Sequence, residues 1–86
     1  MGAEILEERH MIAILLHLRG SGECTKTELY GAVSSNPRMP EKLDILEDAG
    51  LIVQTSNEGS RAVRLGLTDL GRDVAARLAE IDVMLS

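Results

Sequence analysis

Residues 43–72, LDILEDAGLIVQTSNEGSRAVRLGLTDLGR, decide the fold, because they contain the end of one helix, two strands and the start of another helix. Leu43 and Leu46 follow Met39 at intervals of four and three residues, which is the spacing of one apolar helix face. Gly50 then supplies the residue that most easily takes the left-handed conformation at a helix end. The first part of this stretch therefore predicts a helix that ends at about residue 49.

A β-hairpin is predicted next. Residues 51–55 are rich in β-branched side chains, residues 56–60 have the composition of a turn, and residues 61–67 alternate polar with apolar side chains. This order is typical of two antiparallel strands joined by a short loop. Thr68 can then act as the N-cap of a last helix over residues 69–85.

Upstream, an apolar pattern predicts a first helix over residues 4–19. The second half of this helix is apolar almost all round, which indicates burial on more than one side. In a chain of 86 residues one side can face its own core, and the other side is expected to face a second copy of the chain. Residues 20–22, Gly-Ser-Gly, are expected to end the helix.

A capping box marks the start of a second helix. In Thr25-Lys-Thr-Glu28 the Thr25 hydroxyl can accept from the Glu28 amide, and the Glu28 carboxylate can accept from the Thr25 amide. A short extended step at Glu23-Cys24 precedes it. The second helix is expected over residues 26–33, with three inward side chains: Leu29, Ala32 and Val33.

The third helix is expected over residues 37–49, with Asn36 as its N-cap and Pro37 at its first position. Pro40 disturbs this pattern, because it lacks an amide proton and restricts the residue before it. Two alternatives follow: the first turn is distorted, or the helix begins at Pro40. The resulting order is α-β-α-α-β-β-α, a mainly α fold with a small β-hairpin, in one domain over residues 1–86.

Composition excludes several classes of function. The chain has 14 acidic and nine basic residues, a net charge of −5 and a single cysteine, Cys24, so an intrachain disulfide and a Cys₄ zinc site are excluded. His10 and His17 have no further ligands that would complete a metal site. No catalytic triad, phosphate-binding glycine loop or carboxylate pair is visible, and no apolar run is long enough to span a bilayer. We expect a cytoplasmic non-enzyme without metal or cofactor, in which Cys24 is a small buried side chain.

Three more residues have structural interpretations. Gly71 is expected where the last helix crosses another segment closely, and Arg72 is expected to pair with a carboxylate or a carbonyl group. Tyr30, the one aromatic residue, is expected to pack rather than to stack on a nucleotide.

Three stretches together resemble a known family. They are residues 25–29 (TKTEL), 43–52 (LDILEDAGLI) and 67–72 (LTDLGR). They look like the winged helix-turn-helix regulators of the MarR/PadR type, found in bacteria and archaea. In that family a recognition helix ends in L-x-x-L-E-x-x-G-L-[IV], and the hairpin, called the wing, leads into L-T-x-x-G-R before a C-terminal helix. The resemblance covers essentially the whole chain.

The resemblance implies a DNA-binding transcriptional regulator. The helix over residues 37–49 would lie in the major groove, and the wing, residues 51–67, would contact the adjacent backbone or the minor groove. Five cations are the candidate contacts to double-stranded DNA: Lys26, Arg38, Lys42, Arg61 and Arg64. Acidic residues on the same helix oppose this function, because DNA affinity depends on neutralised phosphates. The alternative is a winged-helix module for protein–protein interaction that does not bind DNA.

The resemblance also implies a homodimer held by the first and last helices, residues 4–19 and 69–85. In the last helix, apolar side chains recur at steps of 4, 3 and 4 residues, the pattern of a helix–helix seam. The candidate interface residues are Ile12, Leu16, Val74, Leu78, Ile81 and Leu85. A small apolar effector is a further candidate partner, bound between these helices and the DNA-binding part.

Overall fold

The computed structural model describes residues 2–56, 59 and 62–86. The elements in chain order are a 3₁₀ helix η1 (Ala3–Glu7), α1 (Met11–Ser21), β1 (Cys24–Thr25), α2 (Lys26–Ala32), α3 (Met39–Asp48), β2 (Ile52–Ser56), β3 (Val63–Leu67) and α4 (Asp69–Leu85). The predicted mainly α fold with a β-hairpin is confirmed over these residues. None of the helices described is both long and apolar enough to cross a membrane.

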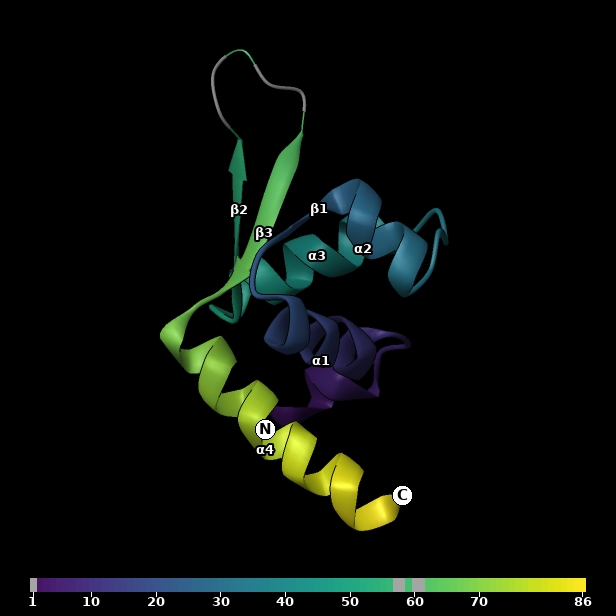
Figure 1. Cartoon of the computed structure of the whole chain (residues 1–86), viewed down its shortest axis with the longest axis vertical. Coiled ribbons are helices and arrows are strands. Elements are labelled where there is room, and N and C mark those ends of the chain that lie inside the picture. Colours follow the sequence, from purple (N-terminus) through teal and green to yellow (C-terminus); the bar gives the residue numbers. More distant parts are fainter. Residues whose placement is uncertain (1, 57–58, 60–61) are drawn as a thin grey trace.

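The sheet has three antiparallel strands in the order β1-β3-β2. β3 pairs along its whole length with β2, from Ile52 opposite Leu67 to Ser56 opposite Val63. The short β1 adds only two residues on the other edge of β3. The hairpin of β2 and β3 therefore extends beyond the rest of the sheet and projects from the body of the molecule (Figure 1).

The core is aliphatic and is centred on α1. In Figure 1 this helix lies between α3 on one side and α4 on the other. One side of α1 is fully buried, and residues from every other α-helix and from all three strands pack around it. The buried set is Met11, Ile14, Leu15, Leu18, Cys24, Leu29, Met39, Leu43, Leu46, Leu51, Ile52, Leu65, Ala75 and Leu78. Because no aromatic side chain belongs to this set, the core depends on interdigitated Leu, Ile and Met.

The predicted first helix over residues 4–19 is wrong in its first half. The chain forms η1, becomes extended at Glu8, takes the left-handed conformation at His10, whose φ is +74°, and starts α1 only at Met11. Residues 7–10 are polar, so a continuous helix would gain no burial there. The break instead lets the apolar pair Ile5 and Leu6 fold back onto the core.

The beginning of α3 also differs from the prediction. Asn36 is not its N-cap: the Asn36 side-chain oxygen accepts from the Arg38 amide (2.8 Å), and Arg38 is the N-cap. The helix begins at Met39, close to the second alternative, with Pro40 in the first turn. A proline is tolerated there because the first four amides of a helix have no intrahelical acceptor.

The capping box of α2 is confirmed. The Thr25 amide donates to Glu28 Oε1 (2.8 Å), and the Glu28 amide donates to Thr25 Oγ1 (3.1 Å). The hydrogen bond from the Thr25 backbone is the main reason that the pKa of Glu28 is lowered. Leu29 is buried as predicted, and Val33 and Tyr30 pack against the core. Ala32 is exposed, contrary to the prediction, because α2 ends there and turns its last residue outward.

Candidate nucleic-acid interface

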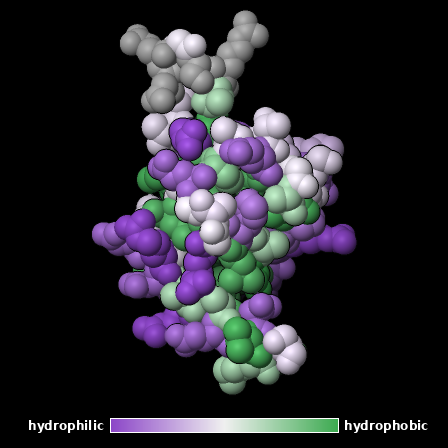
Figure 2. Space-filling view, in the orientation of Figure 1, coloured by the Kyte–Doolittle hydropathy of each residue, from purple (hydrophilic) through white to green (hydrophobic). Residues whose placement is uncertain are grey.

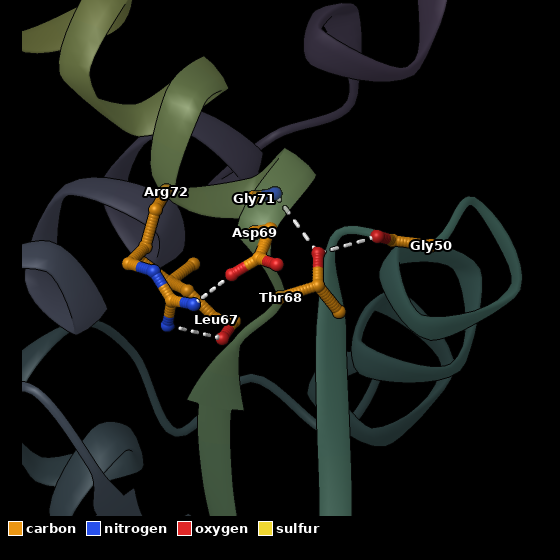
Figure 3. Close-up of polar contacts among 6 residues, drawn as sticks. All are labelled: Gly50, Leu67, Thr68, Asp69, Gly71 and Arg72. Carbon is orange, nitrogen blue, oxygen red and sulfur yellow. Dashed lines mark hydrogen bonds and ion pairs between the residues drawn. The ribbon is translucent and has the colours of Figure 1, made fainter.

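The foot of the hairpin is tied to the start of α4 by one threonine (Figure 3). The Thr68 hydroxyl donates to the carbonyl oxygen of Gly50 (2.6 Å) and accepts from the amide of Gly71 (2.9 Å). The Thr68 amide donates to the carbonyl oxygen of Leu51 (3.1 Å). Thr68 is thus both the N-cap of α4 and the link to the residues where α3 passes into β2.

The two residues that follow in this motif have the predicted structural roles. A Cβ on Gly71 would overlap the carbonyl oxygen of Leu51 and lie 2.9 Å from its carbonyl carbon, so α4 approaches the backbone closely at this point. The Arg72 guanidinium donates to the carbonyl oxygen of Leu67 (3.1 Å) and pairs with Asp69 (Figure 3). Both predictions are confirmed, and both residues hold the hairpin at a fixed place on α4.

α3 buries one face and presents the other to solvent. Met39, Leu43 and Leu46 are fully buried, as their spacing predicts. At the start of the helix, the Arg38 side chain is 76% exposed and lies 3.6 Å from a carboxylate oxygen of Glu41. An exposed pair of this kind is weak in water, so Arg38 remains available to another anion.

Lys42 does not face outward, so the prediction that its side chain lies on the exposed face of α3 is wrong. Its side chain is only 9% exposed, and its Nζ lies 3.3 Å from Glu8 Oε2. Glu8 can reach it because the chain leaves helical geometry between η1 and α1. An ammonium group that is buried and paired in this way joins α3 to the N-terminal segment.

Gln54 of β2 is a functional candidate that the sequence analysis missed. Its side-chain amide donates to Asp44 Oδ1 (3.0 Å) and to Glu47 Oε1 (3.3 Å), and its backbone amide donates to Glu47 Oε2 (3.0 Å). Two of the acidic side chains of α3 are therefore directed toward β2. No local motif could have indicated this contact, because it depends on how β2 lies against α3.

Two of the predicted cations lie on neighbouring elements. Thr25 is opposite Arg64 in the pairing of β1 with β3, so Lys26, the next residue, starts α2 beside Arg64. Arg64 is exposed and lies 3.7 Å from a carboxylate oxygen of Glu23. Figure 1 shows α2, α3 and the hairpin at one end of the molecule, away from the C-terminus of α4. Arg61 lies outside the described residues.

Cys24 is buried, as predicted. Burial raises the pKa of its thiol, and the nearby Glu28 adds to this effect. A thiol in such a site is a poor nucleophile, because only the thiolate reacts rapidly. Among the residues that the structure describes, no group of three or more His, Cys, Asp or Glu side chains is placed to hold a metal ion.

We therefore expect Cys24 to react slowly with iodoacetamide at pH 8 in the native protein and at the rate of a free thiol in 6 M urea. The raised pKa also has a consequence for stability. The folded state holds the thiol proton more tightly than the unfolded state, so the free energy of unfolding should fall as the pH rises above about 9. Mass spectrometry of alkylated samples measures the first effect, and urea titrations between pH 8 and 10 measure the second. Rapid alkylation of the native protein would contradict the burial.

The candidate dimer-interface residues differ in how far they are buried in the chain's own core. Leu78 is buried in the core, and Leu16 and Val74 are partly buried against it. Ile12, Ile81 and Leu85 are exposed, the last at 83%. Figure 2 shows apolar side chains gathered at the end of the molecule where α4 extends beyond the body. The stripe that begins on the core thus continues into solvent.

Comparison with known proteins agrees with this geometry. No family model matches the sequence, and no curated protein matches it. Solved structures do match. A transcriptional regulator of the MarR family from Porphyromonas gingivalis W83 has a TM-score of 0.80 and 22% identity, over 93% of this chain and 80% of that one. The chain has the winged-helix fold of the MarR-type regulators. The hairpin of β2 and β3 is accordingly the wing of this fold.

Two further matches to this winged helix were solved with partners. NadR, in complex with 4-hydroxyphenylacetate, has a TM-score of 0.77 and 26% identity, over 92% of this chain and 60% of NadR. AbfR, bound to DNA, has a TM-score of 0.73 and 21% identity, over 92% of this chain and 63% of AbfR. This winged helix spans less than two thirds of the length of either protein.

Proposed function

We propose that the protein is a homodimeric transcriptional regulator that binds double-stranded DNA in the cytoplasm. In this proposal α3 enters the major groove with Arg38 near the base edges, while Lys26 and Arg64 contact phosphates beside it. The observation that carries the proposal is the winged-helix fold with an exposed cation at the start of α3, Arg38, and another on β3 of the wing, Arg64. Arg61, predicted in the wing, stays a proposed contact, whereas Lys42 does not.

The acidic residues of α3 are the main objection to DNA binding. Asp44 and Glu47 bond to Gln54 on the wing side of the helix, so they are not directed away from the body as Arg38 is. They also lie in the second half of α3, whereas recognition helices contact bases mainly near their N-termini. The positions of Asp44 and Glu47 therefore leave Arg38, at the start of α3, free to be placed against DNA.

The salt dependence of binding tests the proposal directly. If Lys26, Arg61 and Arg64 of both protomers each neutralise one phosphate, log K against log salt should have a slope of about −5. Fluorescence anisotropy with a labelled random duplex between 50 and 300 mM KCl provides the measurement. A slope near zero, or no binding at 50 mM KCl, would remove the DNA-binding proposal and favour the protein–protein interaction module.

Two alanine substitutions should have different effects. Arg38→Ala should change the sequence preference, with a loss of about 1–3 kcal/mol on the preferred site, because Arg38 is proposed to contact bases. Lys26→Ala should weaken binding to all sequences alike and reduce the salt slope by about 1 per protomer. Arg77→Ala is the control, since it removes the same charge from an exposed position on α4. Selection from a random-site library, repeated with each variant, provides the comparison.

The dimer is proposed to form through α4, with the exposed part of α1 beside it. The exposed side chains Ile81 and Leu85 lie on the same stripe of α4 as Leu78, and burial by a second copy would remove this apolar surface from water. A two-fold dimer would present two α3 helices to half-sites about 34 Å apart on one face of the duplex.

An apolar hollow of about 390 Å³ is the proposed place for a small effector. It lies between the N-terminal segment, the end of α3 and the start of α4, and its lining includes Ile5, Leu6, Leu51, Leu70 and Val74. A ligand here would touch Leu51 at the foot of the wing as well as α4. Occupation of the hollow could therefore be coupled to the position of the wing.

A further inference from the structure

The outer edge of the wing has no neighbouring strand among the described residues. β1 pairs with β3 at Leu65 and Arg64, the pair of Ser56 with Val63 lies beyond it, and β2 is the outer strand of the sheet. A two-stranded hairpin is only marginally stable in isolation, and its direction depends on the contacts near its base. On the β2 side, Ile52 is buried in the core to which α3 contributes, and Gln54 makes the polar contact with α3.

The chemistry of this contact is specific. A glutamine amide has two N–H donors in one plane, and here they reach two carboxylates that are three residues apart on one helix face, those of Asp44 and Glu47. The backbone amide of Gln54 adds a third hydrogen bond, to the other oxygen of Glu47. Hydrogen bonds to charged acceptors are stronger than neutral ones, and three of them fix both the distance and the rotation of β2 relative to α3.

We propose that Gln54 is a positioning residue that sets the angle between the wing and α3, so that both can contact one DNA duplex at the same time. This inference rests on the proposed DNA-binding function, because it assigns Gln54 a role within that site. Gln54 itself does not touch DNA. It acts by holding β2, which pairs with β3 at Thr55 and Arg64, while Arg64 is also paired with Thr25 of β1.

The same three hydrogen bonds also position the carboxylates of α3. While Gln54 holds them, Asp44 and Glu47 stay on the side of α3 that faces the wing. If the contact is lost, two negative charges become free to turn toward the phosphates and the wing is free to tilt. Both changes weaken DNA binding, which makes the bridge a determinant of affinity rather than of stability alone.

The test compares Gln54→Leu with Thr55→Val. Both variants replace an uncharged polar side chain of β2 by an apolar one of similar size. Thr55, however, is exposed, and its side chain lies on the other face of the strand from Gln54. Residual dipolar couplings of backbone amides report the orientation of the wing relative to α3. In Gln54→Leu the couplings of Thr55, Ser56 and Val63 should shrink through averaging, while those of α3 and α4 stay as in the wild type. Thr55→Val should leave all of them unchanged.

DNA binding gives the second measurement. Gln54→Leu should lower affinity about tenfold at 50 mM KCl and should make the salt dependence less steep, because the wing and α3 no longer contact one duplex at the same time. Gln54→Glu, which has nearly the same shape but adds a third carboxylate, should bind at least as weakly as Gln54→Leu. A merely destabilising change would lower the melting temperature without altering the salt slope.

Two outcomes would overturn the inference. Unchanged dipolar couplings in Gln54→Leu would show that other contacts set the wing angle. Affinity and salt slope equal to those of the wild type would show that the angle does not affect binding. If the wild type itself does not bind DNA, the proposed function falls together with the role of Gln54 in binding, and the dipolar couplings alone decide whether Gln54 orients the wing.

Discussion

Gly71→Ala should destabilise the protein by about 3 kcal/mol or more, and it should prevent folding at 37 °C. The added Cβ would overlap the carbonyl oxygen of Leu51 and would come within 3.3 Å of a methyl group of Leu67. The clash is with backbone, so a rotamer change cannot relieve it. Any shift of α4 would also stretch the hydrogen bonds of Thr68 to Gly50 and Leu51. Urea unfolding followed by circular dichroism at 222 nm measures the loss.

Gly20→Ala is the matched control. Gly20 lies in the last turns of α1, and a Cβ there would meet nothing within 4 Å. Alanine is the better helix former by about 0.5–1 kcal/mol, so this variant should be slightly more stable than the wild type. If Gly71→Ala and Gly20→Ala have the same stability, the close approach of α4 to Leu51 is contradicted.

Ile81→Glu should convert the dimer into a folded monomer, and the dissociation constant should rise by roughly 100-fold or more. The side chain is 49% exposed on the chain's own fold, so glutamate there does not disturb the core, but in a dimer built on α4 it would bury an unpaired charge. Leu78→Glu should instead unfold the chain, because Leu78 belongs to the core. Sedimentation equilibrium gives the mass, and circular dichroism gives the helix content.

Val83→Glu adds the same charge at the same end of α4, outside the stripe of Val74, Leu78, Ile81 and Leu85. This control should remain dimeric. The opposite pattern, with Val83→Glu monomeric and Ile81→Glu dimeric, would place the interface on another face of α4. A wild-type protein that sediments as a monomer at 100 μM would contradict the dimer itself.

The parts of the fold that sequence could predict are those governed by neighbours along the chain. The capping box at Thr25, the helix end at Gly50 and the cap at Thr68 each involve residues within a few positions of one another, and all three form. The roles of Gly71 and Arg72 could also be predicted from sequence. A residue without a side chain at the start of a helix indicates a close approach, and a permanently charged one there indicates pairing with a carboxylate or a carbonyl group.

The parts that sequence could not predict depend on contacts between distant segments. The position of Lys42 in the sequence of α3 is equally typical of an exposed cation. Only its contact with Glu8, 34 residues earlier, shows that it is buried and paired. The left-handed break at His10 is favoured by the packing of the N-terminal segment on the core, which periodicity does not report. Gln54 looks like an ordinary strand residue until α3 is placed against β2.

The link at Thr68 has a consequence for how such a protein could change its DNA target. Because the base of each wing is bonded to the first turn of α4, the two wings of an α4-paired dimer would be carried rigidly by the helices that join them. Substitutions among residues 78–85 that alter the crossing angle of the paired helices would then change the spacing of the two half-sites. The bases preferred within each half-site would stay the same, since the residues of α3 that read them are untouched.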